Sequence, residues 1–262
     1  MQLFGSGRDE PVLRASVRSD RGRVHTHNED ACLVDVERGL FAVADGVGGQ
    51  PAGDVAAQVA VQRLPGLIDQ ALSQMREGAN DAIEQAIVDL SEMVQAEAQA
   101  SPELSGMATT VVMVLVTSDV AHVAHVGDSR AYLARDRQVY RLTDDHSLAA
   151  ELVQSGVITD EEANTHPFAH SITQAIGLPN TLQPTVQQLE LVPNDRLLLC
   201  SDGLTDMVPE ADIGAILTAG ADMDETSQAL IDAANAAGGK DNISVIVVDF
   251  TPDADRPGAA LS

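Results

Sequence analysis

The sequence has 262 residues, of which 44% are hydrophobic, so it can bury a sizeable core. Its 40 Asp and Glu residues against 15 Lys and Arg give a formal net charge of −25 at pH 7, and a field of that sign repels nucleic acid and anionic lipid. With 2% aromatic residues, no Trp and no run of about 20 apolar residues, the chain lacks a base-stacking surface and a membrane span. We therefore expect no nucleic-acid partner and no membrane partner.

β-type runs and helical periodicity both occur in the first hundred residues. Apolar residues at helical spacing predict two long helices, over residues 53–74 and 79–99, and Pro65 should bend or break the first. Three β-type runs precede these helices, at residues 14–19, 31–36 and 40–44. The order of elements is therefore not a simple βαβ repeat.

Four β-type segments follow closely in the middle of the chain, at residues 109–117, 120–126, 131–135 and 139–142. The connections Ser118-Asp119 and Asp136-Arg137 have only two residues each. Parallel strands need a crossover of a dozen or more residues, whereas antiparallel strands can be joined by two. These strands should therefore pair antiparallel.

The last part of the chain begins with a polar stretch, residues 147–178, that contains two short predicted helices, 148–155 and 160–165. Three further strands and two helices complete the pattern: strands at 185–189, 196–200 and 243–250, and helices at 210–217 and 225–236. Antiparallel sheet with separate amphipathic helices indicates an α+β fold whose helices cover sheet faces. We expect one domain over residues 12–251 and a flexible tail over 252–262.

Several carboxylates stand at the ends of apolar runs, where a strand would deliver them to one margin of a sheet. The segments are Asn28-Glu29-Asp30, Asp45-Gly46, Gly127-Asp128-Ser129-Arg130, Asp202-Gly203 and Lys240-Asp241-Asn242. A charge at the margin of a core is costly unless it is paired or binds metal, and the basic residues are too few to neutralise all five sites. Each segment alone is commonplace, since a lone Asp-Gly is usually a turn. Together they indicate a site for Mg²⁺, Mn²⁺ or Ca²⁺, which prefer oxygen ligands.

In their order along the chain, these segments resemble the motifs of the type 2C (PPM) metal-dependent protein serine/threonine phosphatases. The resemblance extends over residues 14–250 and is closest to the short bacterial form of the family. The matching motifs are Asn28-Glu29-Asp30, Val43–Gly49, Ala108-Thr109-Thr110, Val126–Tyr132, Leu142–Ser147, Cys200–Leu204 and Lys240–Ser244.

The resemblance implies a four-layer α-β-β-α sandwich, in which two central antiparallel β-sheets are flanked by helices. It also implies two to three Mn²⁺ or Mg²⁺ ions in a cleft at one sheet edge. By the family pattern, Asp45 bridges two ions and the carbonyl group of Gly46 binds one of them. Asp202 and Asp241 complete the coordination of the other ion, and Asp128, together with Asp202, binds the third ion.

The implied reaction is hydrolysis of phosphoserine and phosphothreonine in phosphoproteins by a metal-activated water, without a covalent enzyme intermediate. Such an enzyme opposes a Ser/Thr kinase. Glu29 and Asp30 are the candidate catalytic residues, and because they are adjacent they should point to opposite faces of an extended chain. The family pattern favours Asp30. Residues 143–180 correspond to the flap beside the cleft in bacterial relatives.

One departure from the family pattern affects phosphate binding. His25 stands where the family usually has an arginine that grips the substrate phosphate. Imidazole cannot make the bidentate contact of a guanidinium group. His25 is therefore the candidate substrate-binding residue by position, and Arg23 or Arg130 could take over its role.

A second departure affects proton donation. The histidine that follows Asp-Gly in many eukaryotic relatives, proposed there as the general acid, is Val47 in this chain. Water, His27 or His146 must then protonate the leaving group. Two alternatives to an active protein phosphatase follow: a catalytically weak regulatory or phosphoprotein-binding domain of the same fold, and a phosphoesterase acting on small molecules.

The cysteine usage bears on the compartment. The sequence has two cysteines, Cys32 and Cys200, both in apolar surroundings, and no Cys-x-x-Cys pair. Its first residues lack the apolar stretch of a signal peptide. Reduced, buried thiols fit a cytoplasmic protein. We expect a cytoplasmic monomer whose partners are phosphorylated proteins.

Overall fold

The computed structural model describes residues 12–48, 52–75, 78–163, 166–168, 171–179 and 181–251. Its strands form two five-stranded sheets in which every pair of neighbours is antiparallel. One sheet has the order β2-β3-β4-β5-β8: β2 (Ala31–Asp35), β3 (Leu40–Ala44), β4 (Val111–Thr117), β5 (Val120–Val126) and β8 (Thr185–Glu190). The other has the order β1-β10-β9-β6-β7: β1 (Val12–Asp20), β10 (Ile243–Thr251), β9 (Asp195–Cys200), β6 (Arg130–Arg135) and β7 (Gln138–Arg141).

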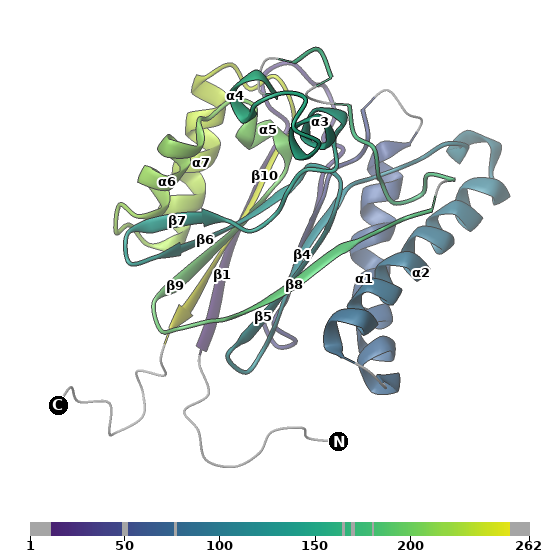
Figure 1. The fold of residues 1–262 in the computed structure, drawn as a ribbon, viewed down its shortest axis with the longest axis horizontal. Helices are drawn as coiled ribbons and strands as arrows, with labels where there is room; N and C mark the ends of the chain where they lie inside the picture. Colours follow the sequence, from purple (N-terminus) through teal and green to yellow (C-terminus); the bar gives the residue numbers. More distant parts are fainter. Residues whose placement is uncertain are drawn as a thin grey trace.

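Helices cover the outer face of each sheet, so the molecule has four layers (Figure 1). The long helices α1 (Gly53–Gln74) and α2 (Ala79–Ala100) pack beside each other on the β2-β3-β4-β5-β8 sheet. On the other side lie α5 (Asp202–Thr205), α6 (Glu210–Leu217) and α7 (Met223–Ala236). The short helices α3 (Leu148–Gln154) and α4 (Asp160–Ala163) stand at one end of the sandwich, and a 3-10 turn, η1 (Pro102–Leu104), follows α2.

The alternation of side chains along each strand builds three apolar layers. In β3, Phe41 and Val43 are fully buried between the two sheets. Leu40, Ala42 and Ala44, from the same strand, pack against α1 and α2. Strands that are covered on both faces read as continuous apolar runs, and this explains why β3 and β4 contain no polar residue among their buried positions.

The predicted four-layer fold is confirmed, and most strands and helices begin and end within two or three residues of the predicted bounds. The predicted break at Pro65 does not occur, and one short helix was missed. The helix α1 runs through Pro65 without a break, because Leu64 and Ile68 are buried on either side of it and hold the helix to the sheet. The short helix α5 was not predicted, since its four residues are too few for a periodic pattern. The predicted tail over 252–262 lies outside the described residues.

Within the described part of the chain, no helix is long and apolar enough to cross a membrane.

Candidate metal centre

The register of the sheets brings the ends of four strands to one edge of the sandwich. In the first sheet, the beginning of β2 pairs with the end of β3, with Ala31 opposite Ala44. In the second, the beginning of β10 lies beside the end of β9, with Val245 opposite Cys200. The residues just outside these ends therefore meet, and they are the carboxylates Asp30, Asp45, Asp202 and Asp241.

Asp45 and Asp202 lie at the centre of this cluster. Burial, followed by the charges of Asp30, Asp202 and Asp128, raises the pKa of Asp45 well above its ordinary value. Burial and the charges of Asp128, Asp206 and Asp241 raise the pKa of Asp202 in the same way. The two side chains are close enough to share a hydrogen bond, which two carboxylates can do only when one of them is protonated. Without cations, burial and repulsion therefore make the charged form of both carboxyl groups costly.

Glu29 and Asp30 have different neighbours in the structure. Asp30 accepts a hydrogen bond from the Ser201 hydroxyl at 2.9 Å, and burial raises its pKa to about 6. Its other oxygen, Oδ1, is buried without a hydrogen-bond partner in the described structure. The Glu29 carboxylate instead lies against the first turn of α1, at Gly53. Asp30 thus belongs to the cluster, while Glu29 flanks it.

Asp128 joins the cluster from the turn between β5 and β6. Burial, followed by the charge of Asp145, raises its pKa to about 6, and Asp206 adds to the shift. Asp206 was missed in the sequence. It follows Asp202 by four residues, so one turn of α5 places it on the same face, and this spacing was the available signal.

Asp241 connects the cluster to His25. The His25 Nε2 atom lies 3.4 Å from Asp241 Oδ1, and both side chains are about half exposed. The side chain of Asn242 fixes the loop that carries His25: its amide nitrogen donates to the carbonyl groups of Arg21 and His27, both at 3.0 Å. His25 therefore stands at the rim of the site, beside a carboxylate, in an ordered loop.

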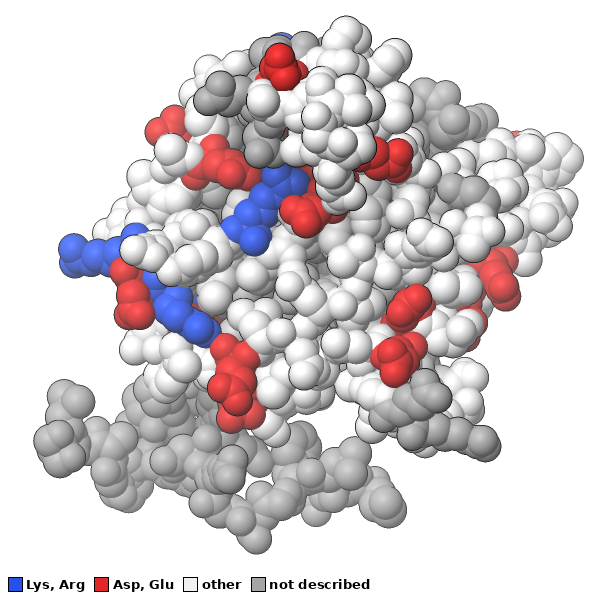
Figure 2. Space-filling view, in the orientation of Figure 1, with Lys and Arg blue, Asp and Glu red and all other residues white. Residues whose placement is uncertain are grey.

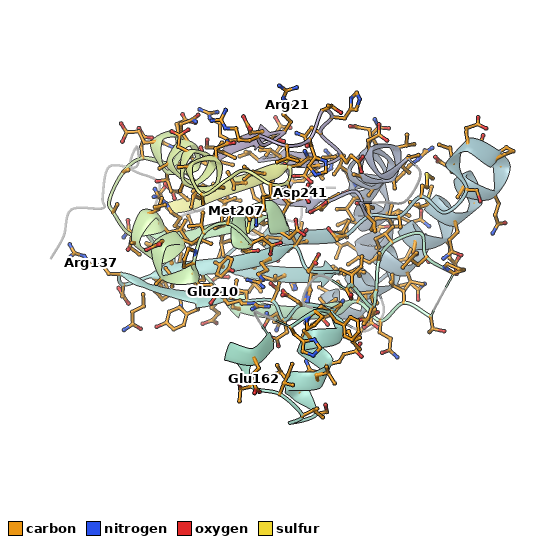
Figure 3. The ribbon with its side chains drawn as sticks, turned by 90° about the horizontal axis from the view of Figure 1, so that it is seen from above. Arg21, Arg137, Glu162, Met207, Glu210 and Asp241 are labelled. Atoms are coloured by element: carbon orange, nitrogen blue, oxygen red, sulfur yellow. The ribbon has the colours of Figure 1, made fainter. Side chains whose placement is uncertain are left out.

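A pocket of about 170 Å³ opens beside the cluster. Its lining residues come from two loops, one after β9 and one before β10: Gly203, Asp206, Met207, Lys240 and Asp241. Figure 3 shows Met207 and Asp241 near each other in the middle of the molecule, with Arg21 at the edge above them. Glu162, in α4, lies on the opposite side in this view. The carboxylate edge thus continues into a hollow that is open to a substrate.

The donor set fits divalent cations. All the groups are oxygen ligands, the buried Oδ1 of Asp30 lacks a partner, and mutual repulsion raises the pKa of several carboxyl groups. No three His, Cys, Asp or Glu side chains in the described ranges already converge on one point. Carboxylates repel one another when no cation lies between them, so an entering cation, which keeps several waters of its own, would draw its ligands together.

Two of the alternative groups for phosphate binding and proton donation, Arg130 and His146, have other partners in the structure. Arg130 is held by Asp145 in a bidentate pair, with Nε–Oδ1 2.9 Å and Nη2–Oδ2 2.6 Å, so it is not free to bind phosphate. His146 stacks on His125 with ring centroids 4.5 Å apart, and burial lowers its pKa to about 4. A histidine with that pKa is neutral at pH 7, and a neutral imidazole is a poor general acid.

Comparison with known proteins gives one consistent family. Residues 20–241 match the family model described as protein phosphatase 2C. The chain is 36% identical over 241 residues to the serine/threonine phosphatase stp of Listeria innocua, covering 90% of this chain and 96% of the relative.

Solved structures agree with this match. The crystal structure of the serine/threonine phosphatase PstP from Mycobacterium tuberculosis is 36% identical and superposes with a TM-score of 0.83, covering 92% of this chain and 99% of that one. A structure of the PstP catalytic domain in complex with two manganese ions is 35% identical, with a TM-score of 0.79 and the same coverage.

Proposed function

Since the chain belongs to the protein phosphatase 2C family, we propose that its carboxylate cluster is the catalytic centre of a metal-dependent phosphatase. The enzyme hydrolyses phosphoserine and phosphothreonine in phosphoproteins and uses Mn²⁺ or Mg²⁺. The observation that supports the assignment of its centre is the meeting of Asp30, Asp45, Asp128, Asp202 and Asp241 at one sheet edge, with raised pKa values where burial and repulsion combine.

Each residue has a proposed role. Asp45 and the carbonyl group of Gly46 would hold the first ion, and Asp45, Asp202 and Asp241 the second. Asp128 would bind a third ion together with Asp202. The approach of Gly46 to α1 supports its part, because a Cβ at this position would lie 2.5 Å from the carbonyl carbon of Gly53. Only glycine lets the backbone come this close.

When bound, the metal ions activate water for attack on phosphorus and neutralise the negative charge that the reaction concentrates there. The residues of the chain do the rest. Asp30, held by the Ser201 hydroxyl, orients the attacking water and accepts its proton. Glu29 flanks the cluster near α1, and His25 receives the substrate phosphate at the rim.

The alternative of a catalytically weak regulatory domain finds no support among the relatives, which are named as phosphatases. The test is direct. Isothermal titration should detect Mn²⁺ binding to the wild-type chain, and Asp45→Asn should lose both Mn²⁺ binding and phosphopeptide hydrolysis. Full hydrolysis by Asp45→Asn at low Mn²⁺ would place the centre elsewhere.

The finer assignments belong to the same proposal. A single catalytic domain spans residues 12–251, with residues 143–180 as a flap beside the cleft. The enzyme opposes a Ser/Thr kinase in signalling, works in the cytoplasm and acts as a monomer. The free thiols of Cys32 and Cys200 support a reducing compartment. The net charge of −25 supports a monomer, because it makes copies of the chain repel each other.

A further inference from the structure

Three basic side chains lie on two neighbouring loops beside the carboxylate cluster. Lys240, the single lysine of the sequence, lines the pocket there, together with Gly203, Asp206, Met207 and Asp241. Arg21 and Arg23 lie in the loop that packs against the Lys240 loop, and all three basic side chains are exposed. Figure 3 shows Arg21 at the outer edge of the molecule, above Asp241. We call Arg21, Arg23 and Lys240 the basic rim.

The backbone holds the two loops of the basic rim together. The N–H group of Arg23 donates to the carbonyl group of Gly239 at 2.6 Å, and the side chain of Asn242 donates to the carbonyl group of Arg21 at 3.0 Å. Between them, Gly22 has a φ of +74°, and a Cβ there would collide with the Gly239 carbonyl group. The backbone of the two loops therefore keeps the three basic residues close to each other and to the carboxylate cluster.

The basic rim differs from most other basic residues of the molecule. On the face seen in Figure 2, basic side chains over β6 and β7 lie against acidic ones. Within the described ranges, no carboxylate lies within ion-pair distance of the basic rim. The remaining arginines mostly have such partners: Arg18–Asp224, Arg38–Asp35, Arg63–Glu97, Arg130–Asp145, Arg135–Asp195, Arg141–Asp145 and Arg196–Asp249. Unpaired cations on a chain of charge −25 are available to a negatively charged ligand.

We propose that the basic rim selects phosphoproteins that carry Asp or Glu next to the phosphorylated serine or threonine. This rests on the proposed function, which places the phosphate at the carboxylate cluster. Asp241, which borders Lys240, is there a metal ligand, so bound ions balance its charge and leave Lys240 positive.

The charge of the whole chain explains why such a rim matters. A surface of net charge −25 repels acidic peptides, so an acidic substrate approaches only where a local field has the opposite sign. Three neighbouring cations beside the cluster supply that field. A substrate with Lys or Arg in the same place would instead meet like charges, which is an effective way to reject a wrong partner.

The test compares three phosphothreonine peptides of equal length, with Ala, Glu or Lys on both sides of the phosphorylated residue, at saturating Mn²⁺ and low salt. The wild-type enzyme should hydrolyse the Glu peptide with a kcat/KM about tenfold above that of the Ala peptide, since each exposed charge pair contributes a factor of about two. The triple variant Arg21→Gln, Arg23→Gln, Lys240→Gln should reduce this ratio to about one. A ratio near one in the wild type, or an unchanged ratio in the variant, would overturn the proposal.

Arg137→Gln is the matched control, because Arg137 is exposed, has no acidic partner among the described residues and lies far from Arg21 in Figure 3. It removes one positive charge and should leave the Glu-to-Ala ratio unchanged; a loss of selectivity in this control would mean that total charge, and not the basic rim, selects the substrate. Arg21→Glu with Lys240→Glu should turn the preference toward the Lys peptide. Failure of the wild type to hydrolyse any of the three peptides would contradict the phosphatase function itself, and the selectivity with it.

Discussion

For Asp45 and Asp202, the requirements of folding and of the proposed metal centre conflict. Each carboxyl group is buried beside others of the same charge, and burial and repulsion both raise its pKa. A cluster of this kind costs free energy in the metal-free protein and becomes favourable only when cations enter.

The first prediction follows from this conflict. Asp45→Ala and Asp202→Ala should each abolish phosphopeptide hydrolysis, because each removes a proposed metal ligand. In EDTA, neither should lower the midpoint of thermal unfolding, since each substitution also relieves repulsion. Circular dichroism melts in EDTA measure this. A marked drop of the midpoint in both variants would show that the two carboxylates support the fold.

The second prediction concerns pH. The pKa of Asp30 is about 6 in the folded state, above the ordinary value of 3.8. A raised pKa means that the folded protein binds more protons than the unfolded one between these values, so stability falls as pH rises. For the metal-free protein, Asp30 should cost about 1–3 kcal/mol as pH rises from 4 to 7, because one pKa unit corresponds to about 1.4 kcal/mol.

Urea unfolding of wild type and Asp30→Asn in EDTA, at several pH values, isolates this contribution. The difference in unfolding free energy should grow in favour of Asp30→Asn as pH rises. Asp35→Asn is the matched control with the opposite sign, because hydrogen bonds from Arg38 lower the pKa of Asp35. A pH-independent difference for Asp30→Asn would contradict the raised pKa.

The third prediction concerns His25, which lies 3.4 Å from Asp241 at the rim of the site. His25→Arg should lower KM for p-nitrophenyl phosphate about tenfold at pH 8, with less gain at pH 6, since a charge-assisted hydrogen bond contributes about 1.5–3 kcal/mol. Steady-state kinetics at both pH values checks this. An unchanged kcat/KM at both would show that position 25 does not contact the phosphate, and Arg23 would be the next residue to test.

At the scale of elements, an ion-pair network joins the segment that follows β7 to the second sheet. Arg130, at the start of β6, pairs with Asp145, and Arg141, in β7, donates to the same carboxylate at 2.6 Å. The side chains of Arg130 and Asp145 are only 17% and 14% exposed. Glu210, at the start of α6, accepts from the Tyr132 hydroxyl at 3.1 Å and joins the network. The start of β6, the end of β7 and the start of α6 are therefore joined through Asp145 and Glu210.

The fourth prediction is that Arg130→Gln lowers the free energy of unfolding by about 1.5–3 kcal/mol, because it removes charge-assisted hydrogen bonds to Asp145, whose charge Arg141 still compensates. Asp145→Asn in the same background should add much less than it does alone. Urea unfolding of the two single variants and the double variant measures the coupling. Strictly additive losses would mean that the pair does not act as a unit.

The strands and their antiparallel pairing could be predicted because two-residue connections leave no other geometry, as at Ser118-Asp119. The meeting of Asp30 with Asp45 follows from the register of β2 and β3, which the resemblance implied but a single sequence does not state. The ion pair between Arg130 and Asp145 could not be predicted, because the two residues are fifteen positions apart and only the folded chain brings them together. The continuity of α1 through Pro65 likewise depends on tertiary packing that local propensity does not contain.

At the scale of the whole molecule, the carboxylate cluster lies in a protein that is itself strongly acidic. Both repel a phosphate group, so we expect substrate binding to require cations at the cluster. Two sheets, each covered by helices, provide a rigid edge, and the strand ends deliver the carboxylates to it. Ions that bind only the folded state also stabilise it, by about 2.7 kcal/mol at a concentration of 100 Kd. Metal binding should therefore appear in stability as well as in activity.

The most direct test of the central claim is the rate of phosphothreonine-peptide hydrolysis as a function of free Mn²⁺, starting from enzyme exhaustively treated with EDTA. We predict no measurable turnover without metal, recovery on adding Mn²⁺ or Mg²⁺, and a parallel rise in the thermal unfolding midpoint. Both responses should be absent in Asp45→Ala. Substantial turnover by the metal-free enzyme, or Mn²⁺-dependent turnover that survives in Asp45→Ala, would contradict the account.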